Sequence, residues 1–182
     1  MRTSIASRRG RRLAAAVVVA LSAGCSDYSP AAPALYRGTP DRCPTLGVPA
    51  GSRLDLHAYA RGVQIYRWNG TSWAFVEPSA VLFADAEGNS AVGTHFAGPT
   101  WRSTSGSTVV GAVIERCTPD ASAIPWLLLG ATATEGPGVF ERTAFIQRVN
   151  TVGGLAPAAP GSAVGETASV PYTAEYLFYR AE

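Results

Sequence analysis

The chain contains two histidines, His57 and His95, and any acid–base chemistry by histidine must use one of them. His57 lies on the polar side of an alternating run, where a histidine usually faces solvent or a sheet edge. His95 lies in the segment Gly93–Trp101 (GTHFAGPTW), whose glycines and proline interrupt a regular strand. Irregular segments on a rigid scaffold often carry functional sites. Two interpretations of His95 therefore stay open: an acid–base or ligand-binding group, or a side chain that hydrogen-bonds to hold a bend.

A second group of polar side chains follows a long apolar segment and precedes the pair Gly153-Gly154. Its amide and guanidinium groups could stabilise negative charge on a ligand or a reacting group. Alternatively, its Asn and Thr side chains cap backbone groups in a structural loop. A tryptophan beside His95 could stack on a flat ligand or pack at the rim of the core. Together these observations predict a binding site formed by His95, Trp101, Gln147, Arg148 and Asn150.

The sequence lacks the spacings of several other kinds of site. No Cys-x-x-Cys or His-x-x-x-His pair indicates a metal centre, and we expect no metal and no cofactor. The chain has no Gly-x-Ser-x-Gly nucleophile motif. Its acidic residues are scattered, and nothing selects two of them as a catalytic pair for glycoside cleavage.

The charge distribution argues against nucleic-acid binding. All 15 basic residues are arginine, and five of them fall in the first twelve positions. From Cys25 onward, 10 arginines stand against 13 acids, a net charge of 10 − 13 = −3. Recognition of phosphates needs clustered positive charge, and the remaining arginines are dispersed along the sequence. We therefore expect no nucleic-acid partner.

Residues 1–24 have the three parts of an export signal: an Arg-rich start, a short apolar run and small residues before a break. Ser22–Cys25 resembles the lipobox of bacterial lipoproteins, in which the cysteine is acylated, although Leu21 stands one place too early. Ordinary cleavage after Gly24 is the alternative. Residues 25–44 are rich in Pro, Ala and Ser, which predicts a tether. We expect a cell-envelope protein held to a membrane by an N-terminal lipid, or under the alternative a secreted or periplasmic one.

Cysteine usage agrees with export. Three cysteines would leave one unpaired thiol in an oxidising compartment. If Cys25 carries the lipid, Cys43 and Cys117 remain as a pair. A disulfide between them would stabilise the fold by roughly 4 kcal/mol because it closes a long loop. Two unpaired buried thiols are the alternative.

Residues 45–182 form a domain of short strands separated by turns, with no sustained helical periodicity. Segments 124–129 and 139–149, joined by a Gly-Pro-Gly turn, are the predicted centre of the core. Asn69-Gly70 predicts a type I′ hairpin turn, and Pro78 is expected to end the strand that follows. The pattern predicts an all-β fold, a single antiparallel β-sandwich or flattened β-barrel of about eight to ten short strands. The strands are expected at 54–59, 63–68, 73–76, 81–84, 109–117, 124–129, 139–149 and 172–180, with 93–101 as a bent edge.

Five segments resemble, in order, those of one protein family: 62–66 (GVQIY), 93–101 (GTHFAGPTW), 123–128 (AIPWLL), 146–154 (IQRVNTVGG) and 170–174 (VPYTA). The family is numbered 3455 among domains of unknown function and is found in exported bacterial and secreted fungal proteins. The resemblance covers about residues 48–180 and implies no activity, because the family is uncharacterised. Some fungal relatives carry a malate dehydrogenase label. This chain has no Gly-x-Gly-x-x-Gly motif and no parallel βαβ pattern, so the label finds no support in the sequence.

Two functional hypotheses follow. The first is an exported β-domain that holds a small molecule or an envelope partner in the mouth of its barrel. The second is a cofactor-independent enzyme that uses His95 as acid and base, with Arg148 or Gln147 stabilising negative charge. Both hypotheses require His95 and Arg148 to face the same cavity, which only the folded chain decides.

Overall fold

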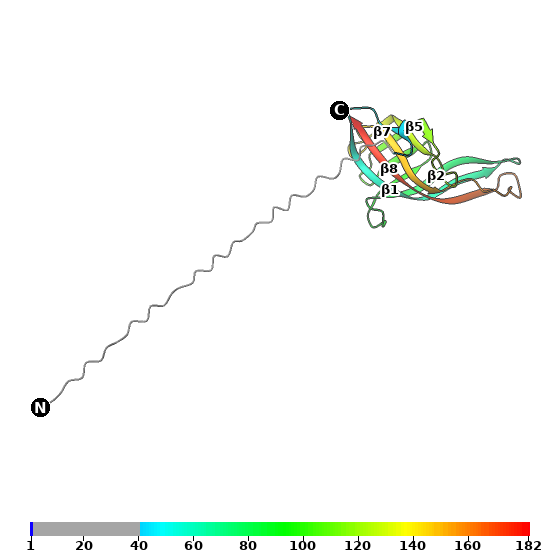
Figure 1. Ribbon diagram of the computed structural model, residues 1–182. Coiled ribbons are helices and arrows are strands. Elements are labelled where there is room, and N and C mark those ends of the chain that lie inside the picture. Colours follow the sequence, from blue (N-terminus) through cyan, green and yellow to red (C-terminus); the bar gives the residue numbers. More distant parts are fainter. Residues whose placement is uncertain (2–40) are drawn as a thin grey trace. The chain divides into compact units, whose positions relative to one another are not determined.

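The two longest strands, β1 (Ser52–Trp68) and β8 (Thr167–Ala181), pair antiparallel along most of their length and close the sheet (Figure 1). The computed structural model describes residues 41–182, together with Met1. Within this part, eight antiparallel strands follow one another around a closed barrel in chain order. This confirms the all-β antiparallel prediction. The remaining elements are the 3₁₀ helix η1 (Pro44–Leu46) and strands β2 (Trp73–Phe83), β3 (Ala91–Phe96), β4 (Thr100–Ser103), β5 (Thr108–Cys117), β6 (Trp126–Glu135) and β7 (Thr143–Gly153).

The predicted leader, the lipidation candidate Cys25 and most of the predicted tether lie outside the described residues. In the part of the chain that is described, no helix has the length and apolar character needed to cross a bilayer.

Strand β1 is one long strand, whereas the sequence predicted two strands separated at Arg61-Gly62. Gly62 continues the ladder, opposite Ala80 on one side and Tyr172 on the other. A Cβ atom at this position would overlap the carbonyl oxygen of Ser79. The glycine is therefore a site of close backbone approach and not the end of a strand.

Strand β2 also continues where a break was expected, because it runs through Pro78. Strand β3 pairs with β2 only at residues 80–83, so the proline lies where β2 has no neighbour on that side. The turn before β2 differs from the predicted type I′ turn as well. It is a four-residue loop in which the Asn69 side chain accepts hydrogen bonds from the backbone N–H groups of Thr71 and Ser72. Among its residues only Gly70 has a positive φ.

The segment predicted to be a bent edge is instead the β3–β4 hairpin. Residues 97–99 form its turn, and His95 lies directly opposite Trp101. The predicted central strand pair is shorter than expected, because β7 begins at Thr143 and pairs with β6 over only four residues of each strand. Phe140 precedes β7 in a turn and is still fully buried.

The barrel interior is packed by large aromatic side chains against small ones. Tyr176 of β8 faces Ala58 of β1, and Ala174 faces Ala60. Alanines on β1 leave the volume that the aromatic rings of β4 and β8 fill. The core cluster consists of Ala58, Ala60, Ala80, Leu82, Trp101, Val109, Ile124, Leu129, Phe140, Ile146, Tyr172, Ala174, Tyr176 and Phe178.

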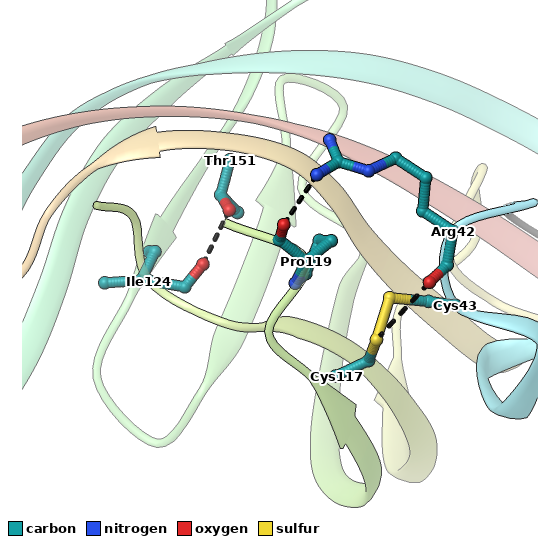
Figure 2. The surroundings of a disulfide bond; sticks show 6 residues. All are labelled: Arg42, Cys43, Cys117, Pro119, Ile124 and Thr151. Carbon is teal, nitrogen blue, oxygen red and sulfur yellow. Dashed lines mark hydrogen bonds between the residues drawn. A yellow bond between two sulfur atoms is a disulfide. The ribbon is translucent and has the colours of Figure 1, made fainter. Parts of the chain in front are cut away.

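A second buried cluster lies on the opposite face of β6, β7 and β8, under the entering segment, residues 42–48, which precedes β1. There Leu46 packs with Leu177 and Tyr179. Strand β8 thus buries residues on both of its faces. Residue Cys43 is joined to Cys117 at the end of β5 by the predicted disulfide, with 6.0 Å between the two Cα atoms (Figure 2).

The side chain of Arg42 adds a second link beside the disulfide, since its guanidinium donates to the carbonyl oxygen of Pro119 (Figure 2). The entering segment is thereby fixed to the loop between β5 and β6. This loop leads directly to residues that line the cavity described next.

A cavity at the mouth of the barrel

Two lateral rows of inward-facing residues form the candidate site. In the first row, neighbouring strands place Arg116, Leu127, Arg148 and Tyr176 opposite one another across β5, β6, β7 and β8. In the second row, Ala80, His95 and Trp101 are opposite one another across β2, β3 and β4. Residues directly opposite in a ladder point to the same face of the sheet, so each row presents its side chains together.

These rows border a cavity of about 560 Å³, which falls within the size range of small-molecule sites. Its wall is mainly apolar, and it reaches the rim where Phe75 and Val76 are 54% and 43% exposed. The lining residues are Gln64, Tyr66, Phe75, Val76, Pro78, His95, Gly98, Pro99, Trp101, Val113, Arg116, Ile124, Pro125, Leu127, Leu129, Arg148 and Tyr176.

His95 is held in this wall as a neutral acceptor. Its Nδ1 lies 2.9 Å from the carbonyl oxygen of Thr100, which can only accept, so Nδ1 carries the proton. The imidazole stacks on the Trp101 ring, with 4.4 Å between centroids and 6° between planes. Burial, with a smaller effect from the Arg148 charge, lowers the pKa of His95 to about 3. At neutral pH, Nε2 is therefore an unprotonated acceptor.

Arg148 brings a positive charge to the cavity. Its Nε and one terminal nitrogen donate to the carbonyl oxygen of Pro125 at 3.1 and 2.8 Å, which fixes the side chain on β7. Burial raises the pKa of Tyr66 and of Tyr176, and the Arg148 charge opposes this rise with a smaller effect. Neither of the ion pairs found among the described residues includes Arg148.

Polar atoms of the cavity wall are buried without a hydrogen-bond partner. The indole N–H of Trp101 and the amide nitrogen of Gln64 are in this state, and each residue is at most 3% exposed. Leaving such a group unsatisfied costs about 1–3 kcal/mol. Polar atoms of this kind are typical of a site that completes its hydrogen bonds with a ligand or water.

Gln147, by contrast, lies on the other face of β7. Because side chains alternate along a strand, the neighbour of an inward-facing Arg148 must face outward. Gln147 is fully buried there, where its amide donates to the carbonyl oxygen of Leu46 at 2.6 Å and accepts from the hydroxyl of Tyr179 at 2.9 Å. The structure thus places it between the barrel and the entering segment, away from the cavity.

Asn150 also lies outside the cavity, although its spacing from Arg148 would place both on one face of a regular strand. The pairing of β7 with β8 shifts by one residue between Val149 and Val152, which marks a β-bulge. Asn150 has a φ of +51° in this bulge, and its side chain is exposed and donates to Glu175. The inward position passes to Thr151, whose hydroxyl donates to the carbonyl oxygen of Ile124 (Figure 2).

Arg148, His95 and Trp101 are thus the three predicted site residues that the fold brings to one cavity. Sequence reasoning missed Arg116, Gln64 and Tyr176. Each stands in an alternating strand where nothing but the register decides which neighbours it meets. His57, which was interpreted as an edge residue, is half-buried beside Glu175, with 2.8 Å between its Nε2 and a carboxylate oxygen. Among the described residues, no group of three or more His, Cys, Asp or Glu side chains could hold a metal ion.

Comparison with known families agrees with the resemblance noted in the sequence. The model of a family described as a protein of unknown function, DUF3455, matches residues 49–180. The chain belongs to this family. All the strands except the last residue of β8 fall inside the matched range, and so does the whole cavity wall. Neither a curated protein nor a solved structure matches the chain.

Proposed function

We propose that this DUF3455 domain is a binding module that holds a small organic molecule in the cavity at the mouth of its barrel. The observation that carries the proposal is a cavity of about 560 Å³ whose apolar wall contains buried polar atoms that have no hydrogen-bond partner in the protein. An apolar wall with a few placed polar groups is the general pattern of small-molecule sites. The apolar surface supplies affinity, and the polar atoms select an orientation.

The same geometry favours binding over acid–base catalysis. A general acid or base works best when its pKa lies near the working pH. With a pKa of about 3, His95 carries no proton on Nε2 at neutral pH and is a weak base. It is suited to accept a hydrogen bond from a ligand.

Export to the cell envelope, with a lipid on Cys25, is part of the proposal. The Cys43–Cys117 disulfide supports it, because such bonds persist mainly in oxidising compartments. The composition of residues 1–24 supports it as well. The mass of the mature chain purified from membranes would test the anchor, with a Cys25→Ser variant for comparison. An acyl-free wild-type chain that begins at another residue would contradict it.

Binding is tested with a neutral fluorescent probe, N-phenyl-1-naphthylamine, titrated into the purified full chain. We expect saturable binding that is weakened in Leu127→Trp, because the larger ring occupies part of the cavity. Leu155→Trp is the matched control, since Leu155 is 40% exposed and lies outside the cavity wall. Absent binding, or equal binding by the two variants, would contradict the proposal.

A further inference from the structure

The charged side chains of the cavity wall have one sign. Arg116 and Arg148 stand on either side of Leu127 in the same lateral row, on β5 and β7. Among the residues that the structure describes, no Asp or Glu belongs to the cavity wall. The domain as a whole carries more acids than arginines, so this local excess of positive charge runs against its composition.

Arg148 retains N–H donors that its contacts within the protein do not use. A guanidinium has five N–H donors, and two of those of Arg148 go to the carbonyl oxygen of Pro125. The Tyr176 hydroxyl lies close enough to interact with the same group, and donors still remain for a ligand. Arg116 is exposed and makes no hydrogen bond or ion pair among the described residues. Two cations with free donors thus border an apolar space.

We propose that the ligand of this cavity is an amphiphilic organic anion, a molecule with an apolar body and a compact acidic group such as a carboxylate. This inference rests on the proposed binding function and adds the charge of the ligand. The guanidinium of Arg148 receives the acidic group, because planar N–H forks match carboxylate oxygens. Arg116 at the exposed side adds a weaker attraction.

The rest of the wall fits the remainder of such a molecule. Phe75, Val76 and Leu127 offer apolar surface from the rim inward. Deeper in the wall, the indole N–H of Trp101 offers a donor, and Nε2 of His95 offers an acceptor. A positively charged ligand is disfavoured, because it would meet the arginines without any carboxylate to compensate.

A matched pair of probes tests the charge preference. The anion 8-anilinonaphthalene-1-sulfonate and the neutral N-phenyl-1-naphthylamine share an aromatic body and differ in the sulfonate. The Kd of each is measured on the full chain and on Arg148→Gln, Arg148→Lys and Arg116→Gln. Arg53→Gln is the charge-matched control, because Arg53 is exposed on β1 outside the cavity wall.

The expected result concerns the ratio of the two Kd values. Arg148→Gln should reduce the preference for the anion about tenfold, as a charge-assisted hydrogen bond would. Arg148→Lys should retain most of the preference, Arg116→Gln should reduce it about threefold, and Arg53→Gln should leave it unchanged. Circular dichroism confirms that each variant is folded. If Arg148→Gln does not fold, Arg116→Gln still decides the question.

The two proposals fail in different ways. If both probes bind and neither Arg148→Gln nor Arg116→Gln changes the Kd ratio, the charge inference is overturned while the binding function stands. If neither probe binds the wild-type chain, the binding function and the inference fall together.

Discussion

Mild acid should destabilise this domain through the buried imidazole of His95. The side chain is 3% exposed, and its pKa is lowered by burial to about 3, against 6.5 for an ordinary histidine. Between these two values the unfolded chain binds a proton that the folded chain excludes. Stability therefore rises with pH in this window, and it falls as the pH drops below 6.5.

The magnitude follows from the two pKa values. One pKa unit corresponds to about 1.4 kcal/mol, so the loss between pH 7 and pH 5 is about 2 kcal/mol. The measurement is urea unfolding of the disulfide-intact chain, followed by tryptophan fluorescence at both pH values. In His95→Asn the amide nitrogen can take over the donor role of Nδ1 toward Thr100, and the pH-dependent loss should shrink by about 2 kcal/mol.

His57→Asn is the matched control, because it makes the same substitution at the other histidine. Comparison of this control with the double variant isolates the contribution of His95 in the absence of the other imidazole. The reasoning is refuted if His95→Asn loses as much stability between pH 7 and pH 5 as the wild-type chain does. Such a result would mean that His95 is protonated in the folded state as readily as in the unfolded state.

Three further changes test the scaffold around the cavity. Replacing Cys43 and Cys117 by serine should lower the free energy of unfolding by about 4 kcal/mol, and a loss below about 1 kcal/mol in chemical denaturation would contradict this. Gly62→Ala should destabilise the barrel by about 3 kcal/mol, because the new Cβ meets backbone atoms of β2; an unchanged thermal midpoint would show that β1 and β2 can separate locally. Gln147→Leu should cost about 2 kcal/mol, because the Leu46 carbonyl and the Tyr179 hydroxyl each lose a hydrogen bond to Gln147, while probe affinity stays the same. A loss of probe binding without a loss of stability would place Gln147 in the ligand site after all.

The sequence determined the class of the fold because alternation and turn residues are local signals. Polar and apolar residues alternate with the period of a strand through most of the chain after residue 52, and glycines punctuate the turns. Counting cysteines was enough to predict the Cys43–Cys117 pair, given the assumption that Cys25 is modified. These inferences need no knowledge of which strands become neighbours.

The exact strand limits were harder to predict, and the reasons are tertiary. Pro78 normally argues against a strand interior, yet β2 tolerates it because β3 has already ended beside it. Gly62 resembles a turn residue in the sequence, yet it sits in mid-strand because the backbone of β2 approaches it closely. A local pattern cannot report what a distant strand does at the same position.

The candidate site shows most clearly the difference between what local sequence signals predict and what the tertiary structure decides. The residue types and their neighbours in the sequence were enough to propose His95, Trp101 and Arg148 as site residues. Nothing in the sequence distinguished Gln147 and Asn150 from them. Alternation sends Gln147 to the opposite face, and a bulge turns Asn150 out to solvent.

The sequence by itself determined an all-β chain, a disulfide, and a set of polar side chains capable of binding. Only the tertiary structure decided which of them share a cavity, because strand register sets the lateral rows that bring Arg116 and Arg148 together and place His95 against Trp101. Register depends on hydrogen bonds and packing between strands that are far apart in the chain. A shift of one residue would turn every one of these side chains to the other face.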